Sequence, residues 1–141
     1  MQQFGLELPY RPQKLRNLPK ALTLARKAVE LTPGEWLYLN TLGVAHYRMG
    51  QYEQAIEILE QSLRESEEKF AAYDLFFLAM CHACRGQATE AKECNERAVR
   101  WVQEQRDRLR AEAKKELDAF RAEADAMLRQ GAKSGRAAPG S

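Results

Sequence analysis

The sequence has no long uninterrupted run of apolar residues, and this absence excludes several classes of protein. No segment approaches the roughly 18 consecutive apolar residues that a membrane-spanning helix needs, so we expect no membrane association. The N-terminus, MQQFGLELPYRPQK, lacks a basic start followed by an apolar stretch, so no secretory signal is expected. Three cysteines, an odd number, do not form a disulfide framework. These absences together predict a cytoplasmic protein.

Residues that carry catalysis or bind metals are also few. The chain has two histidines and lacks a Ser/His/Asp order, a paired-carboxylate arrangement, a phosphate-cradling glycine loop and a zinc-protease motif. Cys81 and Cys84 enclose His82, but there is no second cysteine pair to complete a tetrahedral zinc site. The order CHAC also differs from haem attachment, which needs the histidine after the second cysteine. We therefore expect no enzyme activity, no metal and no cofactor.

The charge is unevenly distributed although the net charge is only +2. Residues 1–30 carry six basic and two acidic residues, whereas residues 31–104 carry seven basic and twelve acidic ones. The basic sequence RDRLR (106–110) is interleaved with acidic residues, as on a solvated helix face. An acidic central body disfavours nucleic acid, so we expect no nucleic-acid partner.

An internal repeat dominates what the sequence does contain. The segment WLYLNTLGVAHYRMGQYEQAIEILEQSL (36–63) is answered 36 residues later by AYDLFFLAMCHACRGQATEAKECNERAV (72–99), and KALTLARKAVELTP (20–33) aligns with the second half of the unit. Matching positions include Leu42 with Leu78, Gly43 with Ala79, Ala45 with Cys81, His46 with His82, and Gly50 with Gly86. Residues that follow the repeat period are explained by packing, so we interpret the two histidines and Cys81 as core residues.

Each repeat unit is predicted to form two antiparallel helices, because apolar residues recur at spacings of three and four and a glycine divides the pattern. The first helix should begin near Pro33, with Thr32 and Glu35 in capping-box spacing, and end at Gly50. The next three are expected over 52–65, 70–85 and 88–104. Small residues at Gly43 and Ala55 are expected to let the first two helices approach closely.

A further helix is predicted beyond Glu104, since neither proline nor glycine occurs before Gly131. Ala113, Leu117, Phe120, Ala124 and Met127 form one apolar stripe, too short for a coiled coil. We favour a break near 104–110 and a helix that folds back to cap the last repeat, although continuity with the preceding helix stays open.

The repeat resembles the tetratricopeptide repeat, whose pattern begins W-x2-L-G-x2-Y. Leu39 stands where the family prefers Trp, Leu42-Gly43 match, His46 replaces Tyr, and Glu67 occupies the place of the closing proline. The resemblance implies an all-α fold, a right-handed solenoid of antiparallel helix pairs with a C-terminal capping helix. It divides the chain into an extended segment (1–17), a repeat array (18–104), a capping helix (105–130) and a disordered tail (131–141). The array consists of a half repeat (18–33) and two full repeats (34–69 and 70–104).

The same resemblance implies a non-enzymatic scaffold that binds a protein or peptide in a concave groove. Mapped onto this chain, the groove is lined by mostly apolar and aromatic residues, which favour an apolar or amphipathic partner. The lining residues are Leu37, Asn40, Val44, Tyr47, Arg48, Tyr73, Phe76 and Met80, with Cys84 beyond them. An alternative is that the chain fills this groove with its own helix over 110–129.

Self-association is a second hypothesis for function. The half repeat lacks its first helix, so Leu22, Ala25 and Val29 need a cover, which Phe4, Leu6, Leu8 and Tyr10, a second chain or an upstream domain would supply. A homodimer would pair through this edge or through the C-terminal helix. The amino-acid sequence over about 20–129 is similar to the C-terminal repeat arrays of large bacterial signalling proteins, including serine/threonine kinases. No kinase motif is present, so no kinase activity is expected.

Overall fold

The computed structural model describes residues 17–134, and this part of the chain consists of helices joined by short turns. The helices are α1 (Leu18–Leu31), α2 (Trp36–Arg48), α3 (Tyr52–Glu65), α4 (Ala71–Cys84), α5 (Ala88–Gln105), the 3₁₀ turn η1 (Arg106–Arg108) and α6 (Ala111–Ser134). Within the described residues there is no strand, so the predicted all-α fold is confirmed.

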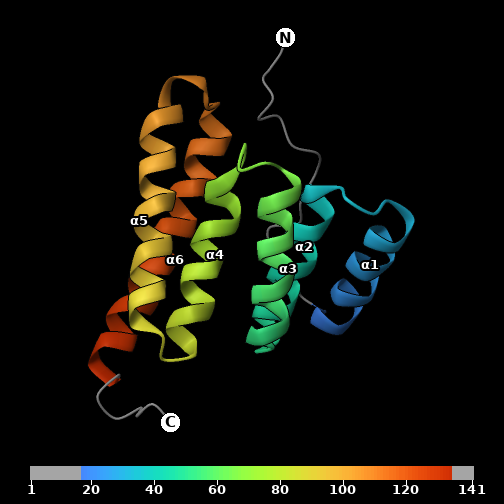
Figure 1. The fold of residues 1–141 in the computed structure, drawn as a ribbon, viewed down its shortest axis with the longest axis horizontal. Coiled ribbons are helices and arrows are strands. Elements are labelled where there is room, and N and C mark those ends of the chain that lie inside the picture. Colours follow the sequence, from blue (N-terminus) through green and yellow to red (C-terminus); the bar gives the residue numbers. More distant parts are fainter. Residues whose placement is uncertain (1–16, 135–141) are drawn as a thin grey trace.

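The helices follow one another across the molecule in chain order, and α6 then returns along α4 and α5 (Figure 1). The pairs α2–α3 and α4–α5 are the two halves of successive repeats, α3 also packs on α4, and α1 packs on α2. None of the helices between Leu18 and Ser134 is long and apolar enough to cross a membrane.

The turn inside each repeat is built in the same way. After α2, Gly50 adopts a left-handed backbone with φ of +77°, and the N–H of Gln51 donates to the carbonyl of His46 at 2.9 Å. After α4, Gly86 has φ of +75°, and Gln87 donates to His82 at 2.8 Å. Glycine suits this position because it has no Cβ to clash in the left-handed region.

The two repeat histidines strengthen these turns. Nδ1 of His46 lies 2.7 Å from Oε1 of Gln51, and Nδ1 of His82 lies 2.7 Å from Oε1 of Gln87. An amide oxygen only accepts hydrogen bonds, so each imidazole donates through Nδ1. The histidines therefore tie the end of one helix to the start of the next, which explains why they follow the repeat period.

The junction between the repeats departs from the family pattern at Glu67. Glu67 and Glu68 have φ of +55° and +63°, and the N–H of Glu68 donates to the carbonyl of Leu63 at 3.0 Å. Proline is locked near a φ of about −65°, so it cannot occupy this left-handed position. The lengthened turn after α3 therefore requires the replacement of the closing proline.

The predicted start of α2, the first helix of the first full repeat, is wrong. We expected it near Pro33 with Thr32 as its cap, but α2 begins at Trp36, and its N-cap Glu35 makes no side-chain cap hydrogen bond. Thr32 instead ends α1 and donates its N–H to the carbonyl of Ala28 at 2.9 Å. Gly34 turns the chain with φ of +84°. Because α1 runs to Leu31, Thr32 and Pro33 belong to its C-terminal turn, where proline is common.

The end of the chain shows both agreement and difference. The predicted break between helices is confirmed, since η1 separates α5 from α6 and α6 packs against α4 and α5. The helix continues to Ser134, so it includes the first four residues of the expected disordered tail (131–141). The expectations for residues 1–16 and 135–141, including Phe4, Leu6, Leu8 and Tyr10, lie outside the described residues.

Close approach of α2 and α3 depends on Gly43, as the sequence indicated. A Cβ added to Gly43 would lie 2.6 Å from Cγ and Cδ2 of Leu59, which is fully buried. Such a distance is far inside van der Waals contact, so an added methyl group would displace Leu59 within a packed core.

Gly43→Ala is expected to lower the free energy of unfolding by about 1–2 kcal/mol, because overpacking against Leu59 outweighs the gain in helix propensity. Urea unfolding followed by circular dichroism measures the change. A gain in stability would contradict the close approach as a constraint.

Candidate partner-binding face

The residues predicted to line the groove lie together on α2 and α4, but they are covered. Seven of the eight are buried, namely Leu37, Asn40, Val44, Tyr47, Tyr73, Phe76 and Met80. The side chain of Arg48 is 34% exposed. Cys84 is half-buried at the end of α4.

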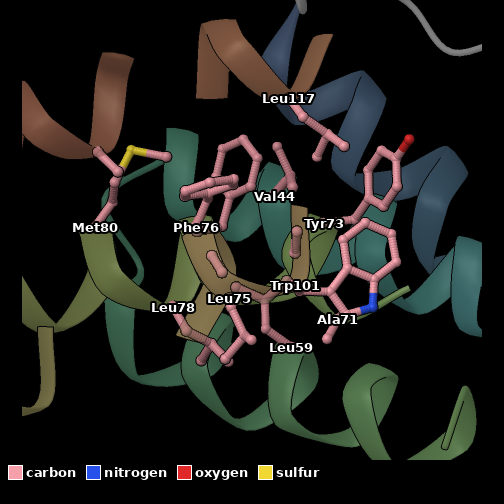
Figure 2. Close-up of a cluster of buried hydrophobic side chains, with 14 of the residues drawn as sticks. Val44, Leu59, Ala71, Tyr73, Leu75, Phe76, Leu78, Met80, Trp101 and Leu117 are labelled. Atoms are coloured by element: carbon pink, nitrogen blue, oxygen red, sulfur yellow. The ribbon is translucent and has the colours of Figure 1, made fainter. Parts of the chain in front are cut away.

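The cover over this surface is the last helix, α6. The apolar stripe of α6, defined by Ala113, Leu117, Phe120, Ala124 and Met127, packs into the core that contains the α2 and α4 residues. Figure 2 shows Leu117 reaching from α6 toward Val44 and Tyr73. The alternative in which the chain fills its own groove with the 110–129 helix therefore describes this structure.

Phe120 makes the most specific apolar contact of α6. Its ring centroid lies 4.8 Å from that of Phe77 with planes at 69°, and 6.5 Å from that of Tyr73 with planes at 79°. Edge-to-face aromatic pairs of this kind contribute about 0.5–1.5 kcal/mol beyond the burial of their area. We call the surface formed by Val44, Tyr47, Tyr73, Phe76 and Phe77 the α2–α4 face.

A charged pair borders the α2–α4 face. The guanidinium of Arg48 donates through both terminal nitrogens to the carboxylate of Glu123 on α6, with Nη2 to Oε1 at 3.0 Å. It also lies over the rings of Tyr47 and Phe77, 5.3 Å and 5.4 Å from their centroids. The hydrogen bond to Glu123 raises the pKa of Arg48, so the cation persists at every relevant pH.

A second polar contact holds α6 to α5. Nδ2 of Asn95 donates to Oδ1 of Asp125 at 3.0 Å. With Arg48 and Glu123, this contact fixes the register of α6, because a shift of one residue would separate both pairs. The register therefore depends on these polar groups, because a shift by one helical turn would keep apolar residues on the face but would still separate both pairs.

Asn40 has a structural role that the sequence did not indicate. Its Nδ2 donates to the carbonyl of Tyr73 at 3.0 Å and to Oδ1 of Asp74 at 2.9 Å, and all three residues are fully buried. Ser62 joins this network through its hydroxyl, 3.1 Å from Oδ2 of Asp74 and 3.0 Å from the carbonyl of Trp36. Buried polar groups that satisfy one another specify a single packing arrangement, so this network aligns α2, α3 and α4.

Phe77 was missed as a member of the face. It follows Tyr73 by four residues, a spacing that places both on one side of α4, but the alignment pairs it with Thr41 of the preceding repeat. The aromatic neighbour Trp101 on α5, 6.4 Å from Tyr73 between centroids, was missed for the same reason. The repeat pattern emphasises what the two units share, and these residues differ between them.

The cysteines lie in surroundings that disfavour thiolates. Burial raises the pKa of Cys81 to about 12 and that of Cys94 to about 11, and it also raises the pKa of Cys84. The protonated thiol is a poor nucleophile and a poor metal ligand. Over the described part of the chain, no three or more His, Cys, Asp or Glu residues are grouped to hold a metal ion.

Residues 35–100, which span α2 to α5, match a family model described as tetratricopeptide repeat. Over these residues the chain is similar to tetratricopeptide repeats, and repeats of this family are generally protein–protein interaction modules. Comparisons with curated proteins and with solved structures found no match.

The raised thiol pKa values predict slow cysteine chemistry. At pH 8 we expect Cys81 in the folded chain to react with an aromatic disulfide reagent at least about 100-fold more slowly than in urea, since a pKa of about 12 in place of 9 lowers its thiolate fraction about a thousandfold. Mass spectrometry of the labelled peptides identifies the reacting residue. Rapid labelling of folded Cys81 would contradict its burial.

Proposed function

We propose that this chain is a protein-interaction module whose α2–α4 face binds an amphipathic helix, and that α6 is the occupant held in cis. The observation that carries the proposal is the packing of Phe120 against Phe77 and Tyr73. An amphipathic helix recognised in a groove presents anchors at spacings of three and four. The stripe of α6 has this spacing, so it represents the kind of helix that the face accepts.

The chemistry of the face also defines the partner. The apolar and aromatic side chains of Tyr73, Phe76 and Phe77 are buried beneath α6 and would bind apolar anchors. Arg48 at the border would bind a carboxylate placed three residues after the central anchor, as Glu123 follows Phe120. A partner helix with an aromatic anchor and a following acidic residue therefore fits this face best.

Binding by an external helix requires α6 to leave. Truncating fully buried Leu117 and half-buried Phe120 to alanine removes about 2–5 kcal/mol each from the packing of α6. The full chain with Leu117→Ala and Phe120→Ala is therefore expected to release α6 while α1 to α5 stay packed. The released face can then be tested with a known helix.

The test uses a fluorescent peptide with the sequence of residues 111–134. Its anisotropy should report binding to the Leu117→Ala, Phe120→Ala chain with a Kd on the order of micromolar, at least about tenfold tighter than binding to the wild-type chain. A peptide with the same two substitutions is the matched control and should not bind. If the variant keeps its helical circular dichroism but the wild-type peptide fails to bind, the proposal is wrong.

A second candidate function is self-association through α1, and it rests on exposed apolar residues. Leu24 is 59% exposed and Leu31 is 73% exposed. Ala21 and Ala28 of α1 are half-buried, whereas Ala55 and Ser62, which align with them on α3, are fully buried. The difference agrees with a repeat whose first helix is missing, and a second copy of α1 would cover this edge.

For this second candidate, we expect the wild-type chain to associate in sedimentation equilibrium at high micromolar concentration, and Leu24→Glu with Leu31→Glu to remain a monomer. Thr23→Glu, at an exposed position of the same helix, is the control and should not change association. A wild-type monomer throughout the concentration range would eliminate this candidate.

A further inference from the structure

The connection between α5 and α6 lacks any residue that breaks a helix. Its sequence, RDRLR (106–110), is followed at once by AEAKKEL, and Gly and Pro are absent from 88 to 130. Arginine, leucine, alanine and glutamate are among the better helix formers, so local preference favours continuation of α5 into α6. Something other than local sequence must therefore hold the break.

The backbone departs from helical geometry at one place that the dihedral angles identify. Arg106 still has helical angles, with φ of −48° and ψ of −45°, and residues 106–108 form the turn η1. Leu109 is extended, with φ of −85° and ψ of 136°. Its side chain is buried in the main core at 6% exposure. Burial of Leu109 therefore holds the bend that lets α6 fold back.

We propose that two copies of this chain exchange α6 by straightening the connection at Leu109. In the exchanged form, α5 and α6 become one helix from Ala88 to Ser134. The α6 part, about 36 Å long, packs on the α2–α4 face of the second copy. This inference rests on the proposed function, because it needs the same face to accept a helix in trans.

The second copy is the occupant because its α6 already carries every matching group. Phe120 of one copy would contact Phe77 and Tyr73 of the other, and Glu123 would pair with Arg48. Each contact now made within one chain would then form between two chains with the same geometry. Helices α5 and α6 run antiparallel to one another (Figure 1). In such a dimer, the two connections would therefore lie near the two-fold axis.

The short connection favours the closed monomer at low concentration. A helix tethered by a few residues has an effective concentration on the order of millimolar, so exchange competes only when the chain is concentrated or the bend is weakened. The balance therefore depends on Leu109, which is buried in the closed form and is released when the bend straightens.

Two substitutions at the connection are expected to change the dimer association constant in opposite directions. Leu109→Ala removes the buried side chain and adds a strong helix former, so the dimer association constant should rise at least about tenfold. In the closed form, Ala111→Pro places proline at the first position of α6, where a helix tolerates it. In the exchanged form, the same proline lies in the interior of the joined helix and disrupts it. The association constant of Leu109→Ala with Ala111→Pro should fall at least about 100-fold below that of Leu109→Ala.

Light scattering after size exclusion, from 10 µM to about 1 mM of full-length chain, measures these constants. A Leu109→Ala chain that stays monomeric, or one that dimerises equally well with Ala111→Pro, would overturn the exchange. Dimers formed through Leu24 and Leu31 of α1 do not involve the connection, so Ala111→Pro would not change their association constant.

A charge-exchange experiment tests the swap without altering the connection. Chains with Arg48→Glu and chains with Glu123→Arg each place like charges together when closed. Refolded as a mixture, they should form a one-to-one dimer in which both charge pairs are restored. The matched control, one chain with both substitutions, should be a monomer. If the 111–134 peptide binds the Leu117→Ala, Phe120→Ala chain but the two charge variants form no mixed dimer, the exchange is overturned and the proposed function stands.

Discussion

The packing of Phe120 against Phe77 and Tyr73 is the contact on which the closed position of α6 depends. Helix α4 is buried continuously from Ala71 to Cys81, so it needs neighbours on every side. Helices α3 and α5 cover two of these sides, and α6 covers the α2–α4 face. Without α6, a row of aromatic and sulfur-containing side chains would meet water, at a cost of about 25 cal/mol for each Å² of apolar area.

The proposed function would give this one surface two roles. The α2–α4 face stabilises the closed chain when α6 occupies it, and it is the face that we propose binds a helix from elsewhere. The two roles compete, since α6 and a partner would need the same contacts with Phe77 and Arg48. The affinity for a partner is reduced by the stability of the closed form, which the burial of Leu109 helps to set.

Much of the fold was predictable because the repeat encodes it locally. The helices from Tyr52 to Gln105 begin and end within about one residue of the predicted limits, and Gly43 packs closely against Leu59 as its small size indicated. The start of α2 was not predictable from the capping signal, because Thr32 had two possible helices to serve and α1 uses it. The residues predicted to line the groove do lie on α2 and α4, but their cover by α6 and the contact through Phe77 were not decided by the pattern.

The sequence alone determined the class of this protein, since a repeat of 36 residues with small residues at fixed places specifies paired helices. It also determined that the inner face is apolar and that α6 is amphipathic. Only the tertiary structure decided that the two meet, because the residues from 105 to 111 favour a continuous helix locally. The bend arises from burial of Leu109 in the main core and from the contact of Phe120 with Phe77, which lies more than 30 positions away in the chain.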